Sequence, residues 1–169
     1  MAVPKQLFLC MGIKVLVVLL TIAVLALLDP TYVTAYISIN YEIVIIYIVS
    51  ALTLLYCIAS CVIYFLIGRG RGDGEEDYVP TNLAMTEVIL CTAGIMGWLI
   101  IIGIGGTVSQ RTIIETGERF GWLAACAGII TGCLLGIAGM FILTIVNDKI
   151  LSRRPKYERG PAVNPYNSY

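Results

Sequence analysis

The sequence predicts an all-α polytopic membrane protein, an antiparallel bundle of four transmembrane helices with both termini in the cytoplasm. Three observations support this fold class. The 169 residues are 59% hydrophobic and 13% charged, and their mean hydropathy is +0.90, whereas soluble domains are about half apolar and about a quarter charged. Four apolar stretches each reach the roughly 20 residues that a membrane-spanning helix needs. The basic residues are unevenly distributed between the ends of these stretches, and such a bias sets the orientation of a membrane protein.

The four predicted helices follow one another with only short connections. The first ends at Asp29-Pro30 and the second at the glycine-rich segment "GRGRGDG", because proline and glycine disfavour the helix interior. Residues 1–148 are therefore predicted to form one transmembrane domain, and residues 149–169 a disordered cytoplasmic tail. The helices are expected at residues 7–28, 43–67, 83–107 and 120–146.

The orientation follows from the lysine and arginine residues near the helix ends. One side carries Lys5, Arg69, Arg71, Lys149, Arg153, Arg154, Lys156 and Arg159. The other side carries only Arg111 and Arg119. Basic residues are enriched in cytoplasmic segments, so we expect both termini and the middle connection on that side, in the plasma membrane or an endomembrane or vesicle. The five basic residues from Lys149 to Arg159 are also predicted to attract anionic lipids, at about 1 kcal/mol per residue.

Glycine recurs at every fourth position of the fourth apolar stretch. Such spacing places residues along one side of a helix, and small residues allow two helix backbones to approach closely in a bilayer. The predicted packing face consists of Ala124, Gly128, Gly132, Gly136 and Gly139 on this helix, with Ala93 and Gly97 as a matching surface on the third. Two interpretations stay open. The face packs against the third helix of the same chain, or it docks another copy or a partner protein.

Two ionisable residues interrupt the apolar stretches. Lys14 lies in the first predicted helix and Glu87 near the start of the third. Charged groups are costly within lipid and are candidates for a functional role. Each side chain could extend separately to the membrane interface. Alternatively, the two could form an ion pair that joins the first and third helices, and a proton or ion pathway is a third interpretation.

The composition argues against several classes of function. Eleven basic and eleven acidic residues cancel, and histidine is absent, which argues against a nucleic-acid partner and removes the commonest general base and metal ligand. The six cysteines lie in apolar runs without a Cys-x-x-Cys pair. Polar residues within the helices are scattered and form no nucleophile–base pair: Thr53, Ser60, Thr92, Thr131 and Thr144. The sequence therefore predicts a protein that is not an enzyme and binds no cofactor or metal.

The whole pattern resembles small tetraspan proteins of the MARVEL type and similar junction- or vesicle-associated proteins. The shared features are four helices, cytoplasmic termini, short loops and faces rich in small residues, and they cover nearly the whole chain. Claudins and tetraspanins differ, because residues 29–41 contain neither tryptophan nor cysteine and no Cys-Cys-Gly motif occurs. The resemblance implies a role in organising membrane domains, vesicle traffic or cell–cell junctions.

We therefore expect a non-catalytic protein that packs laterally in the bilayer, with itself as a homo-oligomer or with a larger membrane protein. An accessory subunit of a channel, receptor or transporter is the alternative interpretation, because it would use the same glycine face. A small transporter is a second alternative.

Overall fold

Four long α-helices make up the part of the chain that the computed structural model describes, residues 5–28, 41–70, 81–111 and 114–152. Each helix is long and apolar enough to cross a membrane, which indicates an integral membrane protein and confirms the all-α class with four candidate spans. Except at the end of α1, which falls one residue short, the helices run a few residues beyond the predicted ranges, because polar residues continue them past their apolar segments. Their bounds are α1 Lys5–Leu27, α3 Tyr41–Gly70, α4 Thr81–Arg111 and α5 Ile114–Ser152.

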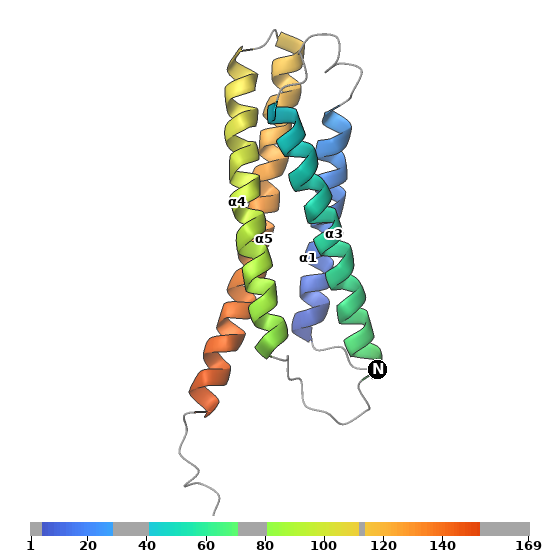
Figure 1. Ribbon diagram of the computed structural model, residues 1–169, viewed down its shortest axis with the longest axis vertical. Coiled ribbons are helices and arrows are strands. Elements are labelled where there is room, and N and C mark those ends of the chain that lie inside the picture. Colours follow the sequence, from blue (N-terminus) through green and yellow to red (C-terminus); the bar gives the residue numbers. More distant parts are fainter. Residues whose placement is uncertain (1–4, 29–40, 71–80, 112–113, 153–169) are drawn as a thin grey trace, which may run out of the picture.

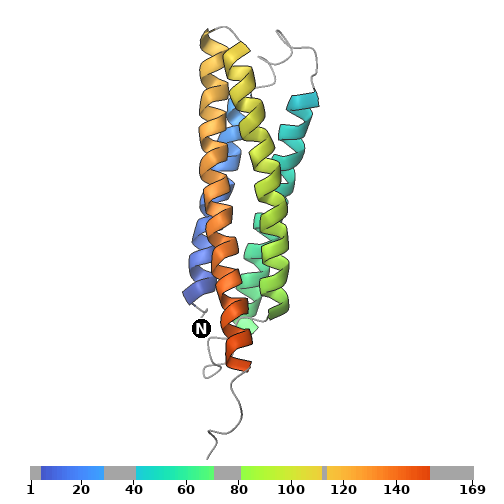
Figure 2. The same ribbon diagram turned by 90° about the vertical axis from the view of Figure 1, so that its left-hand side faces the viewer.

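The helices run alternately up and down and form an elongated antiparallel bundle (Figures 1 and 2). In cross-section the neighbours are α1 with α3, α3 with α4, α4 with α5, and α5 with α1. The α4–α5 interface is the most extensive and the α3–α4 interface the least. Helices α1 and α4 therefore lie diagonally across the bundle. The start of α1 and the end of α5 lie at one end of the bundle, together with the end of α3 and the start of α4 (Figure 1).

The surface of the bundle is as apolar as its interior, unlike that of a water-soluble bundle. Large apolar side chains cover the outside, and Phe8 and Leu143 are 66% and 70% exposed. The buried residues, by contrast, include Lys14, Ser60 and Glu87. Hydrocarbon cannot hydrogen-bond to polar groups, so a membrane-spanning bundle has to satisfy them internally. This arrangement is the one expected when the surrounding solvent is lipid.

Glycines of α4, rather than those of α5, provide the close contacts between helices. A Cβ atom added at Gly105 would lie 3.0 Å from Ala124 Cβ and 3.2 Å from the carbonyl oxygen of Phe120, both on α5. At Gly97 it would lie 3.0 Å from Val49 of α3, and at Gly94 it would lie 3.1 Å from Leu134 of α5. Helix α4 thus uses its small residues on two sides, toward both neighbours.

The expectation that the α5 glycine face packs against α4 is wrong, although the two helices are neighbours. A Cβ atom added at any of the four glycines Gly128, Gly132, Gly136 and Gly139 would meet no heavy atom within 4 Å in the described part of the bundle. The physical reason is helical geometry. At about 3.6 residues per turn, four residues advance the helix by more than one turn, so the row rotates around the axis. Ala124 still faces α4, whereas the glycines that follow face outward.

The contact at Gly105 yields a stability prediction with a matched control. Gly105→Leu forces a side chain against the α5 backbone, so we expect it to lower the free energy of unfolding by about 1–3 kcal/mol, the range seen for overpacked cores. Gly106→Leu adds the same side chain where no atom lies within 4 Å and should cost far less. Reversible unfolding in detergent micelles measures both changes. Equal losses in the two variants would contradict this account of the α4–α5 interface.

Candidate functional site

An ion pair lies at the centre of the bundle. Lys14 Nζ of α1 and Glu87 Oε2 of α4 are 2.7 Å apart, and the two side chains are 0% and 4% exposed. Lys14 lies nine residues after the start of α1, about 14 Å along the helix axis at 1.5 Å per residue. The interpretation that each side chain reaches the membrane interface separately is therefore wrong. The structure contains the paired arrangement that the sequence analysis offered as its alternative.

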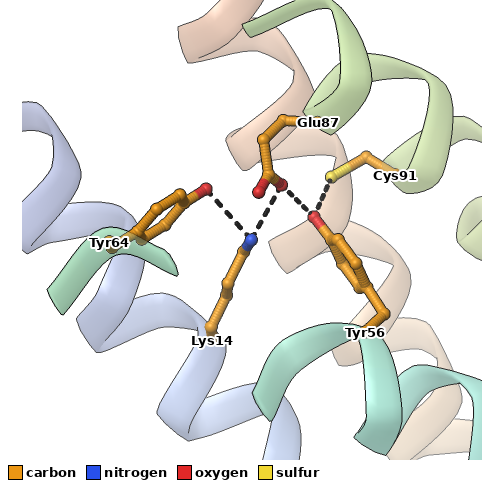
Figure 3. A network of polar contacts seen from close by, with 5 residues as sticks. All are labelled: Lys14, Tyr56, Tyr64, Glu87 and Cys91. Atoms are coloured by element: carbon orange, nitrogen blue, oxygen red, sulfur yellow. Dashed lines mark hydrogen bonds and ion pairs between the residues drawn. The ribbon is translucent and has the colours of Figure 1, made fainter. Parts of the chain in front are cut away.

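Two tyrosines of α3 complete the hydrogen bonding of this pair (Figure 3). The Lys14 ammonium donates to the Tyr64 hydroxyl over 3.0 Å, and the Tyr56 hydroxyl donates to Glu87 Oε2. The Tyr56 hydroxyl also lies 3.2 Å from Cys91 Sγ. In addition, the ammonium lies 4.4 Å from the centroid of the Tyr56 ring, a distance at which an aromatic ring stabilises a cation. We call these five residues the central cluster.

The central cluster contacts all four helices. Lys14 comes from α1, the tyrosines from α3, and Glu87 and Cys91 from α4. The Tyr64 ring packs at 6.5 Å between centroids against Phe141 of α5. Because α1 and α4 are diagonal, the ion pair connects two helices that are not otherwise adjacent. The buried, hydrogen-bonded pair thus links α1 and α4 directly across the bundle.

Sequence reasoning missed the tyrosines of the central cluster. A signal was available, because Tyr56 and Tyr64 lie eight residues apart, slightly more than two turns of a helix. A tyrosine within an apolar span also needs a hydrogen-bond partner for its hydroxyl. Tyr64 lies six residues before the end of α3, and Glu87 lies six residues after the start of α4, so these two are at comparable distances from neighbouring helix ends. No local sequence pattern reveals how α3 is rotated about its axis, and it is this rotation that points both rings inward.

Most of the threonine hydroxyls in the spans are satisfied within their own helices. Each donates to the carbonyl oxygen four residues earlier, a common arrangement that competes with other partners. The residues are Thr21, Thr53, Thr86, Thr92, Thr107, Thr131 and Thr144. Two of them also join helices, since Trp98 Nε1 donates to Thr53 and Gln6 donates to Thr144. Within the described residues, no group of three or more cysteine, aspartate or glutamate side chains could hold a metal ion.

A pocket of about 440 Å³ lies between α3 and α4 beside the central cluster. Its wall includes Tyr56, Ser60 and Glu87, and its other lining residues are mostly apolar. Leu55 and Leu90 also line it and are 66% and 42% exposed on the outside of the bundle. The pocket therefore opens sideways, in the direction in which a bilayer would lie.

The other predicted site residues lie apart from this cluster. Ala93 is exposed and lines the pocket, whereas Gly97 is partly buried against Val49 of α3. Neither residue packs against the glycine face of α5, because Gly128, Gly132 and Gly136 lie on the outside of the bundle. Of the predicted lipid-binding residues, Lys149 is exposed near the end of α5. The other four, Arg153, Arg154, Lys156 and Arg159, lie outside the described residues, as do residues 29–40.

The ion pair predicts non-additive effects on stability. Lys14→Met or Glu87→Met alone leaves one buried charge without its partner, so each should lower the free energy of unfolding by about 3–5 kcal/mol. The double variant removes both charges and should lose less than either single variant. Lys149→Met, at an exposed position, is the control and should change stability by less than about 0.5 kcal/mol. Denaturant titration in detergent measures all four, and losses that simply add would show that the pair does not act as a unit.

Comparison of the chain with protein-family models, with curated proteins and with solved structures finds no match. A proposal for its function therefore has to come from the chemistry of its own surfaces. Three features provide that basis: the central cluster, the pocket between α3 and α4, and the outward glycine face of α5.

Proposed function

We propose that this protein is a non-catalytic membrane protein that packs laterally in the bilayer, through the glycine face of α5, to organise a membrane assembly. The observation that carries the proposal is the exposure of that face. Gly128, Gly132 and Gly136 point away from the chain's own helices, and a Cβ atom there would meet nothing within 4 Å in the described bundle. The backbone of α5 is therefore accessible to another helix over about two turns.

The cost of these glycines supports the proposal. Glycine in a helix interior is about 1 kcal/mol less favourable than alanine in water. The glycines of α4 have an internal use, because Gly94, Gly97 and Gly105 allow close approach to neighbouring helices. Those of α5 lack such a use within the described chain. In lipid, close backbone packing is a main source of helix association. Packing against a helix of another molecule would therefore offset the unfavourable helix propensity of these glycines.

A second copy of the chain is the partner that we favour. A pair of α5 helices can bury both glycine faces in one contact, as a two-fold symmetric interface does. A resemblance to MARVEL-type tetraspans agrees with such lateral organisation at junctions or in vesicles. If the partner is instead a larger membrane protein, the chain acts as an accessory subunit through the same face.

The orientation that we propose places both termini in the cytoplasm, because Lys5, Arg69 and Lys149 lie at one end of the bundle and Arg111 and Arg119 at the other.

Cross-linking in native membranes tests lateral packing. Gly132→Leu fills the glycine face and should reduce the cross-linked species by about fivefold to a hundredfold, since misfitting side chains cost about 1–3 kcal/mol and 1.4 kcal/mol is a factor of ten. Gly12→Leu on α1, where a Cβ atom also meets nothing within 4 Å, should leave cross-linking unchanged. A ladder of multiples of the chain mass indicates self-association, and a single heavier adduct indicates an accessory subunit. Unchanged cross-linking in Gly132→Leu would reject the glycine face as the contact.

Cysteine labelling tests the orientation. Gln110 and Lys149 are both exposed and lie near the ends of α4 and α5, respectively. These two helices end at opposite ends of the bundle (Figure 1). In intact cells, a membrane-impermeant maleimide should label Gln110→Cys, whereas Lys149→Cys should react only after permeabilisation. The chain without an introduced cysteine is the control, because its labelling comes from the native cysteines alone. The reverse pattern would overturn the proposed orientation and leave the lateral packing proposal unaffected.

A further inference from the structure

The pocket between α3 and α4 is long and lies toward one end of the bundle. Its lining extends over residues 49–63 of α3 and residues 83–97 of α4. Fourteen residue steps correspond to about 21 Å along a helix, compared with a hydrocarbon core of about 30 Å. On α4 this length covers the half of the helix nearer its start at Thr81. A molecule in the pocket would therefore occupy mainly one leaflet of the bilayer.

Polar residues line the pocket over much of its length, and Ser60, Thr86 and Glu87 lie toward the end where α3 finishes and α4 begins. Ser60 of α3 is 4% exposed and lines the pocket. Glu87 of α4 also lines the pocket, and its hydrogen bonds from Lys14 and from Tyr56 both end at Oε2.

Small residues and sparse contacts keep the pocket open. Ala59, Ala93 and Gly94 line it, and their size leaves space between the two helices. Toward the opposite end, α3 and α4 meet at Gly97 and Val49 and through the hydrogen bond from Trp98 to Thr53. The bundle thus fixes the separation of the helices without filling the space between them. An apolar pocket of about 440 Å³ with a few convergent polar groups has the size and character of a small-molecule site.

We propose that this pocket binds a neutral membrane lipid with an elongated apolar body and a small head that carries a free hydroxyl. A hydroxyl can donate to the Glu87 carboxylate and accept from Ser60, so it matches both groups. The head has to be uncharged, because Lys14 already neutralises Glu87 and a further buried charge would have no partner. The head also has to be small, since Ser60 and Glu87 lie inside the helix ends, about 9 Å from the start of α4 in the case of Glu87. Bulky, charged phospholipid heads remain at the interface.

Photoaffinity labelling of the full chain in phosphatidylcholine vesicles tests the proposal. Three probes, each with a diazirine in its apolar part, are compared: a sterol, a diacylglycerol and a phosphatidylcholine. We expect saturable labelling by one or both hydroxyl-bearing probes, competed by the same lipid without the diazirine and located by mass spectrometry on the pocket residues of α3 and α4. Comparison of the sterol probe with the diacylglycerol probe shows which shape of apolar body the pocket accepts.

Two pairs of variants make the test specific. Ala93→Phe fills the pocket from α4 and should reduce labelling at least tenfold, whereas Ala51→Phe, an exposed position on α3 outside the pocket, should not. Ser60→Ala removes one hydrogen bond and should weaken binding by about two- to tenfold, as expected for about 0.5–1.5 kcal/mol. Ser50→Ala is its control, because Ser50 is a buried serine of the same helix whose Oγ has no partner among the described residues and which lies outside the pocket.

Several outcomes would overturn the proposal. Equal labelling by the phosphatidylcholine probe, or labelling that Ala93→Phe leaves unchanged, would show ordinary contact with bulk lipid. Labelling that disappears at high protein-to-lipid ratio and returns on dilution would show that a second copy occupies the pocket. Gly132→Leu, which tests the proposed lateral packing, should leave labelling unchanged, so the failure of one proposal is distinguishable from the failure of the other.

Discussion

The ion pair between Lys14 and Glu87 is the interaction on which the arrangement of the bundle depends. It spans the diagonal from α1 to α4, and the two tyrosines that complete its hydrogen bonding come from α3. In hydrocarbon, neither charge can turn to solvent, so each helix has to present its polar group to the same point. That requirement restricts both the depth and the rotation of three helices at once. Apolar contacts with lipid-like side chains would restrict them far less, because lipid tails compete equally well for such surfaces.

Helix α4 shows how the remaining packing follows from this fixed centre. With Glu87 turned toward the middle of the bundle, Gly97 meets α3, and Gly94 and Gly105 meet α5. The small residues of α4 therefore serve contacts within the chain. Helix α5 contributes larger residues, such as Leu134 and Phe141, to the interior. Gly128, Gly132 and Gly136 consequently lie on the outside. The two faces that we assign to other molecules, the α5 glycine face and the α3–α4 pocket, are the places where this internal packing is incomplete.

The two proposals differ in the physics of their contacts. The glycine face is apolar and open, so an occupant gains mainly from close backbone packing, as another helix can provide. The pocket combines an apolar wall with the Ser60 hydroxyl and the Glu87 carboxylate. An occupant there gains from hydrogen bonds in a medium of low polarity, where an unpaired group is costly. A helix suits the first surface, and a small amphiphile suits the second.

The sequence by itself determined the number and approximate positions of the helices, because hydropathy is a local property that adds up along the chain. It also identified Lys14 and Glu87, since a charge within an apolar span is evident without neighbours. Only the tertiary structure decided which way each helix turns. One of the two interpretations of the α5 glycine row had it facing α4, yet Gly128 and Gly132 face outward. Tyr56 and Tyr64 were not foreseen as partners of the ion pair. Helix rotation is set jointly by all the helices in contact, and the period of a single helix carries no information about its neighbours' side chains.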